Sequence, residues 1–335
     1  MDALKLHQES IIIDGHCDTL IPVRDGMKDL MKGFDSEKLE KASRNYTDHI
    51  DIPRMLKGGL TTQLFACFIR YPFLPSNASV ETLRMIDSFY QAVDQYGDQF
   101  AMVTTAAGIE QVKKDGKTSG MITIEGAEAL EGNLAVLRAF YKLGVRQIGL
   151  TWNWRNQAAD GLGEKRTGGG LTEFGVALVK EMNRLGMIVD VAHLAPAGIK
   201  DVCEICEGPF VDSHCGAYGL VPHERNLSDE QLEMVAKKGG LVCVTYVPEF
   251  IQNEPLKATL ADVVDHIDYI VKQIGVDHVG LGSDFDGYTH HVENLDDVGS
   301  LPNITAELVK RGHQEADIKK ILGGNYLRVM RQVIG

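Results

Sequence analysis

From residue 120 to residue 284 the sequence alternates short apolar runs with amphipathic stretches, and this alternation restricts the fold more than any other feature. The apolar runs are rich in Val, Ile and Leu, which is typical of strands buried on both faces. The amphipathic stretches have the apolar spacing of helices, and most end in a glycine directly before the next strand. These glycines are Gly144, Gly186, Gly208, Gly239 and Gly275.

Two further apolar runs, Ile11–Ile13 and Thr61–Ile69, precede this region and are also predicted strands. The predicted strands lie near residues 11, 61, 120, 145, 187, 210, 241 and 279. Eight parallel strands that alternate with helices favour an α/β fold of the closed (β/α)8 TIM-barrel type over an open doubly wound sheet. An open sheet would usually have a glycine-rich dinucleotide loop after its first strand, and Gly15-His16-Cys17-Asp18 is not such a loop.

The length of 335 residues suits one such barrel, which needs roughly 250 residues plus insertions. We therefore expect a single domain over residues 1–335. Residues 19–50 carry mixed charges and little apolar periodicity, which predicts a long loop after the first strand. Residues 305–335 are predicted to form two or three extra helices packed against the outside of the barrel.

The net charge of −13 and the pI near 5.3 argue against a nucleic-acid or anionic-membrane partner, which would need a basic face. The N-terminal residues lack the features of a secretory signal, and no apolar run approaches the ~18 residues of a membrane span. The six cysteines are scattered and lie mostly inside apolar runs, which indicates reduced thiols. We expect a cytoplasmic protein.

Polar side chains follow the predicted strands at the end where a (β/α)8 barrel carries its active site. Ile11–Ile13 leads into His16 and Asp18, whose side chains point to the same side of an extended backbone. The other strand ends provide Glu125, Trp152, Asn153, His193, His214, Asp284 and Asp286. One histidine at a strand end is usually structural, but three of them beside two carboxylates at one rim predict a metal site.

Three imidazoles with Asp18 and Glu125 are too many ligands for one catalytic zinc with an open position, so they favour two metal ions. Glu125 can bridge two ions through its two carboxylate oxygens. Imidazole with carboxylate favours Zn²⁺ over Mg²⁺, with Mn²⁺, Co²⁺ or Fe²⁺ as substitutes. Two ions roughly 3.5–4 Å apart would hold a bridging water and polarise a carbonyl or phosphoryl oxygen, which indicates hydrolysis.

The strand ends contain the motifs His16-x-Asp18, Ile124-Glu125-Gly126, Asp190-Val191-Ala192-His193, Asp212-Ser213-His214, Arg225-Asn226 and Gly282-Ser283-Asp284-Phe285-Asp286-Gly287. This set resembles the membrane (renal) dipeptidase family of binuclear zinc peptidases. The resemblance runs from about residue 10 to the stretch 324–329. Each motif alone is unspecific, whereas the combination is highly specific.

The resemblance implies which residues hold each of the two zinc ions. His16, Asp18 and Glu125 would hold one ion, and Glu125, His193 and His214 the other. Glu125 would therefore bridge the two ions, which would share a hydroxide, and we count it among the catalytic residues.

The resemblance also implies the residues that bind the substrate. Arg225 matches the arginine that grips the free carboxylate of the dipeptide, for which its bidentate fork is suited. Asp284 matches the aspartate that anchors the substrate amine and moves a proton from the bridging hydroxide to the leaving amine. Asp286 is expected to shape the loop that carries Asp284.

One position departs from the family pattern. Members such as the mammalian renal enzyme have a histidine after the fourth strand, where it polarises the substrate carbonyl, and Trp152 stands there in this chain. An indole N–H donates a hydrogen bond but does not titrate. Trp152 either donates through its N–H or forms a wall of the pocket; in the second case Asn153 makes the polar contact or the metals act alone.

The resemblance predicts a zinc-dependent dipeptidase that hydrolyses L,L-dipeptides and also L,D-dipeptides. Related enzymes are commonly dimers, so a homodimer is expected. The mammalian members carry a secretory signal and a lipid-anchor tail, which this sequence does not show, so we expect no membrane partner.

Two other functions stay open. A related binuclear metal amidohydrolase would act on another amide, a lactone or an ester; such enzymes usually begin with His-x-His, whereas this chain has Asp18 in the second place. The other possibility is a catalytically impaired homologue in which the metal ions have only a structural role. The presence of Trp152 in place of the family histidine is the only observation that favours it.

Overall fold

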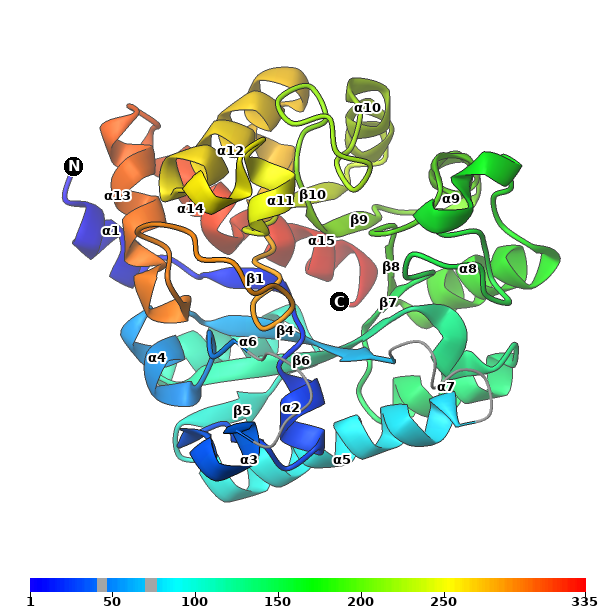
Figure 1. Ribbon diagram of the computed structural model, residues 1–335, viewed down its shortest axis with the longest axis horizontal. Helices are drawn as coiled ribbons and strands as arrows, with labels where there is room; N and C mark the ends of the chain where they lie inside the picture. Colours follow the sequence, from blue (N-terminus) through cyan, green and yellow to red (C-terminus); the bar gives the residue numbers. More distant parts are fainter. Residues whose placement is uncertain (41–46, 70–76) are drawn as a thin grey trace.

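The computed structural model describes residues 1–40, 47–69 and 77–335. Eight parallel strands close into a barrel surrounded by helices (Figure 1). The barrel strands are β1 (Ile13–Cys17), β4 (Thr62–Phe68), β6 (Thr118–Glu125), β7 (Gln147–Gly149), β8 (Ile188–Asp190), β9 (Val211–Cys215), β10 (Leu241–Val244) and β11 (Val279–Leu281). They pair in the order β4-β1-β11-β10-β9-β8-β7-β6, and β4 pairs with β6 to close the ring. The predicted (β/α)8 barrel is confirmed.

Helices follow most of the barrel strands, as the alternating pattern predicted. They are α5 (Ala78–Tyr96), α7 (Leu134–Lys142), α8 (Glu173–Leu185), α9 (Pro196–Ile205), α10 (Asp229–Lys237) and α12 (Leu260–Ile274), and two short helices, α4 (Ile52–Lys57) and α11 (Pro248–Ile251), lie in loops. Gly144, Gly186, Gly239 and Gly275 have positive φ between 69° and 92°, which glycine adopts without strain. The predicted change from helix to strand at these four glycines is confirmed.

The connection between β4 and β6 contains a strand and a helix that were not predicted. After α5 the chain forms a ninth strand of the sheet, β5 (Phe100–Met102), which pairs with Thr118–Gly120 of β6, and then α6 (Ala106–Lys114). The apolar run at residues 100–103 is short, and only Phe100 of the three β5 residues is buried, so this strand was missed.

The predicted loop 19–50 contains short elements of its own. These are α2 (Leu20–Arg24), α3 (Ser36–Glu40) and the antiparallel pair β2 (Lys28–Asp29) and β3 (Gly33–Phe34). Residues 41–46 of this loop lie outside the described residues. The described parts of this loop are therefore folded into short helices and a strand pair rather than extended.

The sequence predicted that the C-terminal helices all pack against the outside of the barrel. This prediction is correct for two of them and wrong for the third. α13 (Pro302–Lys310) and α14 (Glu315–Lys319) lie outside the barrel, and α13 packs on α1 (Ala3–Glu9) and α12. In contrast, α15 (Asn325–Val333) covers the amino-terminal end of the barrel, where its side chains pack on inward-pointing residues such as Ile13 and Leu241.

Tyr326 shows how α15 closes the barrel. Its hydroxyl donates to Gln147 Oε1 over 2.6 Å, and its ring fills space next to Gly15. A Cβ atom at Gly15 would lie 2.9 Å from the backbone oxygen of Ser213 and 3.1 Å from the Tyr326 ring. Only glycine fits there, so the residue before His16 is constrained by packing below the site.

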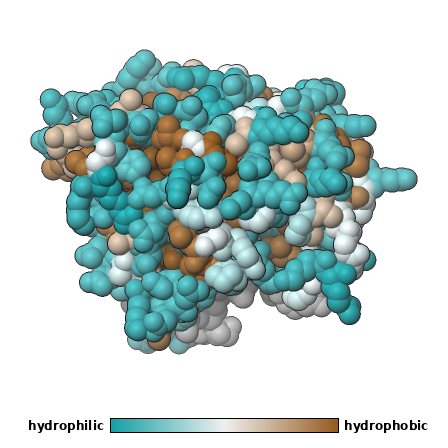
Figure 2. All heavy atoms as spheres, turned by 90° about the horizontal axis from the view of Figure 1, so that it is seen from above, coloured by the Kyte–Doolittle hydropathy of each residue, from teal (hydrophilic) through white to brown (hydrophobic). Residues whose placement is uncertain are grey.

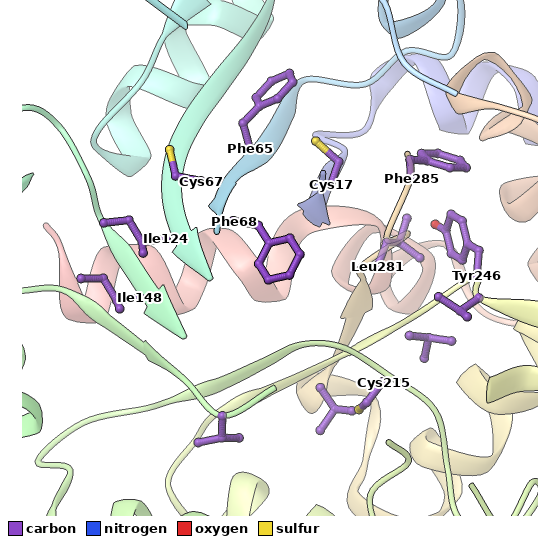
Figure 3. Packing of buried hydrophobic residues seen from close by; sticks show 14 of the residues in the cluster. Cys17, Phe65, Cys67, Phe68, Ile124, Ile148, Cys215, Tyr246, Leu281 and Phe285 are labelled. Atoms are coloured by element: carbon purple, nitrogen blue, oxygen red, sulfur yellow. The ribbon is translucent and has the colours of Figure 1, made fainter. Parts of the chain in front are cut away.

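A second apolar layer fills the space between the barrel and the surrounding helices. Figure 3 shows part of this packing: Phe68 lies in the middle of the view among the strands, and α15 runs behind them. The face in Figure 2 is mostly hydrophilic, with apolar side chains in small groups between polar ones. Among the described residues, no helix is long and apolar enough to cross a membrane.

Candidate metal centre

The residues predicted to bind metal lie together at the carboxyl end of the barrel. His16 and His214 are on β1 and β9, Glu125 ends β6, and Asp18 and His193 follow β1 and β8 directly. All five side chains are buried. Four separate strands thus bring their polar ends to one point, as expected for a parallel barrel.

Glu125 is the centre of this cluster, and its two oxygens face different histidines. Oε1 lies 3.0 Å from His193 Nε2 and 3.7 Å from His214 Nε2. Oε2 lies 3.6 Å from His16 Nε2. Among the described residues, donor atoms of His16, Glu125 and His214 lie within 4.8 Å of one another.

The spacing around His16 suits a cation better than hydrogen bonds. Its Nε2 atom lies 3.7 Å from Asp18 Oδ1 and 3.8 Å from Asp284 Oδ1, which is too long for a hydrogen bond. His16 Nε2 and Asp18 Oδ1 are both buried without a hydrogen-bond partner among the described residues. Ligands bound tetrahedrally at about 2.0–2.2 Å from zinc are separated by about 3.3–3.6 Å, close to these distances.

Two of the histidines are oriented by partners on their other ring nitrogen. Asn153 Oδ1 lies 2.7 Å from His193 Nδ1, and Ser213 Oγ lies 2.8 Å from His214 Nδ1. Because an amide oxygen only accepts, the proton of His193 belongs on Nδ1 and its Nε2 lone pair faces Glu125. Partners of this kind orient metal-binding histidines in many proteins.

The charges of the cluster also favour a cation. Burial by itself lowers the pKa of His16, but Glu125, Asp18 and Asp284 outweigh burial and raise the pKa to about 10. Burial lowers the pKa of His193 and His214 well below the ordinary value, so these rings stay neutral. The cluster therefore combines the neutral imidazoles of His193 and His214 with carboxylates that attract a positive charge to His16, and a metal cation could supply that charge in place of a proton.

Asp284 follows β11 and faces the same cluster through its contact with His16. Burial raises the pKa of Asp284 to about 7. Such a carboxyl group can accept and release a proton at neutral pH. Asp284 and His193 both have positive φ, 63° and 65°, which costs a non-glycine residue roughly 1–3 kcal/mol and often marks a functional site.

Three buried aspartates support the backbone under the histidines. Asp14 Oδ1 accepts from the backbone N–H of Ser283 over 2.8 Å, and Asp190 Oδ1 accepts from Ala192 and Ser213, each over 3.0 Å. Asp212 Oδ1 accepts from the backbone N–H of His214. No role was predicted for these aspartates from the sequence, although each stands two or three residues before a histidine and that repetition could have revealed their role.

Asp286 links the loop after β1 to the loop after β11. Its Oδ2 atom accepts from Lys28 Nζ and Thr19 Oγ1, both over 2.7 Å, and its Oδ1 atom accepts from the backbone N–H of His49 over 2.7 Å. Burial raises the pKa of Asp286, but Lys28 and His49 outweigh burial and lower it. These contacts agree with the expectation that Asp286 shapes the loop that carries Asp284.

The variant Asp286→Asn is expected to lower the free energy of unfolding by roughly 3 kcal/mol, because it removes the charged partner of the buried Lys28. Asp48→Asn removes the other, half-exposed partner of Lys28 and should cost at most about 1 kcal/mol. Urea unfolding of both variants tests this, and equal losses would contradict the role given to Asp286.

Arg225 lies in the loop between β9 and α10 and is buried. Its Nη2 atom donates to the backbone oxygen of His214 over 2.7 Å, and the guanidinium lies over the Phe250 ring at 5.6 Å. Its Nε atom has no hydrogen-bond partner among the described residues. Asn226 anchors this loop by donating to the backbone oxygens of Val221 and Phe250.

His266 supports the same loop and makes its stability depend on pH. Its Nδ1 atom accepts from the backbone N–H of Ala217 over 2.8 Å, which requires a neutral ring. Burial lowers the pKa of His266 to about 4, from 6.5 in the unfolded chain.

Because the unfolded His266 takes up a proton below pH 6.5 and the folded one only near pH 4, its contribution to stability is lost as the pH falls through this range. The expected loss is roughly 3 kcal/mol. Urea unfolding between pH 7 and 4 should show a weaker pH dependence for His266→Gln, whereas His291→Gln, at an exposed position, should behave as the native protein.

Trp152 is half-buried between two aromatic side chains. Its ring centroid lies 5.3 Å from that of Phe68, at the end of β4, and 5.9 Å from that of His193. Trp152 therefore forms an aromatic surface beside the metal-ligand cluster, which consists of the predicted ligands His16, Asp18, Glu125, His193 and His214.

A closed (β/α)8 barrel with imidazoles and carboxylates gathered at one end is the architecture of the barrel metallohydrolases. Residues 1–334 match the sequence profile of the family described as membrane dipeptidase, peptidase family M19. The chain belongs to this family of metal-dependent peptide hydrolases.

Similar proteins agree with this membership. The chain is 35% identical over 334 residues to dipeptidase aclJ of Aspergillus oryzae, covering 94% of this chain and 79% of that protein. It is similar to a metallopeptidase from Rhodobacter sphaeroides, solved with a phosphinate mimic of the dipeptide L-Ala-D-Ala (28% identity, TM-score 0.87, 97% and 100% of the chains). It is also similar to the solved dipeptidase AC of family M19 (30% identity, TM-score 0.85, 97% and 99% of the chains).

Proposed function

We propose that this protein is a dipeptidase that uses two metal ions, best suited to be Zn²⁺, to hydrolyse dipeptides with a free amino and a free carboxyl end. The observation that carries the proposal is the position of Glu125. One of its oxygens faces His193 and His214, and the other faces His16, so a single carboxylate can serve two ions.

Two ions would be held by His16 with Asp18 and by His193 with His214, with Glu125 between them. When bound, they would polarise the peptide carbonyl and lower the pKa of a water molecule. The donor set fits zinc, because neutral imidazole nitrogens and carboxylate oxygens are its usual ligands outside thiolate sites.

The chain's own residues would bind the substrate and move the proton. Arg225 would hold the carboxylate of the dipeptide through the edge that carries its unpaired Nε. Asp284 would bind the substrate amine and pass a proton to the leaving amine, for which a pKa of about 7 is suited. Asn153 would orient His193, and Trp152 would form a wall of the pocket rather than act in place of a titrating histidine.

We propose both L,L- and L,D-dipeptides as substrates, since the similar Rhodobacter sphaeroides protein was solved with a mimic of an L,D-dipeptide. A cytoplasmic location and a homodimer remain predictions from the sequence.

The test combines metal analysis with a panel of dipeptides. The protein loaded with Zn²⁺ should contain two ions per chain and cleave L-Ala-L-Ala or L-Ala-D-Ala, and chelation should abolish cleavage. The same dipeptides with an acetylated amine or an amidated carboxylate serve as matched controls and should be poor substrates. A protein that is fully loaded with metal and cleaves no dipeptide would overturn the proposal.

A further inference from the structure

A cavity of about 780 Å³ lies between α9 and α10, outside the barrel wall and beside the metal-ligand cluster. Cavities of roughly 300–1,000 Å³ are typical of sites that bind small molecules. Its inner end is formed by His193, Asp212 and Arg225. His193 and Arg225 also belong to the proposed active site, so the cavity adjoins the place where the dipeptide would lie.

The wall of the cavity is mainly apolar on the side of α9, whereas α10 contributes Met234 together with the polar Glu230 and Gln231. Leu194 and Ile199 line it from the loop before α9 and from α9 itself, and Met234 lines it from α10. Leu194 and Ile199 are buried, and Met234 is half-buried. Charged side chains such as Lys200 and Glu230 are exposed where they line it. The cavity is therefore suited to a large apolar group.

Arg225 determines which part of a dipeptide would reach this cavity. The side chain and the carboxylate of the carboxyl-terminal residue leave the same α-carbon, so a carboxylate held by Arg225 places that side chain next to the inner end. A methyl side chain would leave most of the cavity to water, whereas an aromatic one would displace much of it.

We propose that this cavity receives the side chain of the carboxyl-terminal residue and that the enzyme favours dipeptides whose second residue is large and apolar. The proposal rests on the proposed dipeptidase function and adds the class of substrate.

The experiment compares kcat/KM for Ala-Phe and Ala-Ala, each with an L- and a D-residue in second place, on the Zn²⁺-loaded protein. We expect the native protein to prefer Phe by at least about tenfold, because binding would transfer the aromatic ring from water into the apolar part of the cavity. Met234→Trp would fill the cavity from α10 and should reduce this ratio at least about tenfold. Leu256→Trp makes a similar change at a side chain that is 84% exposed and should leave both rates unchanged.

Ala197→Leu, which adds bulk from the first turn of α9, is the second variant in case Met234→Trp does not fold, and circular dichroism decides which is used. A native ratio near one, or a ratio that neither variant lowers, would overturn this proposal while leaving the dipeptidase function intact. If no dipeptide is cleaved, the proposed function itself fails, and this inference fails with it.

Discussion

Glu125→Gln is expected to lose bound metal and to lower kcat/KM by at least roughly 10³-fold. Glu125 lies within 3.0–3.7 Å of the Nε2 atoms of all three histidines in the cluster. A glutamine keeps the shape of the side chain but offers one oxygen in place of two and removes the negative charge. Its amide nitrogen would face a histidine where a ligand is needed, so both ions should be affected.

Metal analysis after gel filtration and dipeptide hydrolysis would be measured on the same preparation. Glu128→Gln is the matched control, because Glu128 is a largely buried carboxyl group only three residues further along, with a pKa that burial raises to about 6. It lies outside the ligand cluster, and its variant should keep both the metal and the activity. A Glu125→Gln protein that retains two ions per chain would contradict the bridging role.

The sequence predicted the barrel well because its signals were local. Most barrel strands lie within or beside apolar runs, such as Leu241–Val244 of β10, and a glycine with positive φ ends several of the helices. The predicted ends were less accurate. The strand near residue 187 was expected to end at His193, whereas β8 ends at Asp190 and the chain turns before His193, which has positive φ.

Features that depend on distant residues could not be predicted in the same way. Tyr326 enters the barrel only because Gly15, more than 300 residues away, leaves room for its ring. The short strand β5 lies in an apolar run of only four residues, which does not by itself distinguish a strand from a helix, and its pairing with the edge of β6 makes it a strand. Such elements are determined by tertiary contacts rather than by propensity.

The candidate site also has features that the sequence predicts and features that depend on distant residues. The metal-binding chemistry of His16, Asp18 and Glu125 could be proposed because parallel strands in a barrel must bring their ends together. The partners of the histidines could not, since Asn153 reaches His193 across forty residues of loop and helix. The sequence thus predicts which side chains meet, whereas their orientation depends on contacts that only the structure reveals.

Arg225→Ala is expected to lower kcat/KM for dipeptides by about 10²–10³-fold while the metal content stays unchanged. Arg225 is a buried guanidinium beside the cluster, with an Nε atom that has no partner among the described residues, so it is placed to pair with a carboxylate. Truncation would leave the substrate carboxylate without its charged partner. The loss should be larger for Ala-Ala than for its carboxyl-amidated form, because the amide does not use this contact.

This difference separates a dipeptidase from a metal hydrolase that acts on another amide, a lactone or an ester. In such an enzyme Arg225→Ala would reduce hydrolysis of the free and the amidated dipeptide to the same extent. Arg166→Ala removes an exposed arginine from the 3₁₀ turn Leu162–Thr167 and should change neither rate. Because Arg225 also donates to the backbone oxygen of His214, metal analysis of Arg225→Ala is required to show that the loss comes from substrate binding rather than from a displaced ligand.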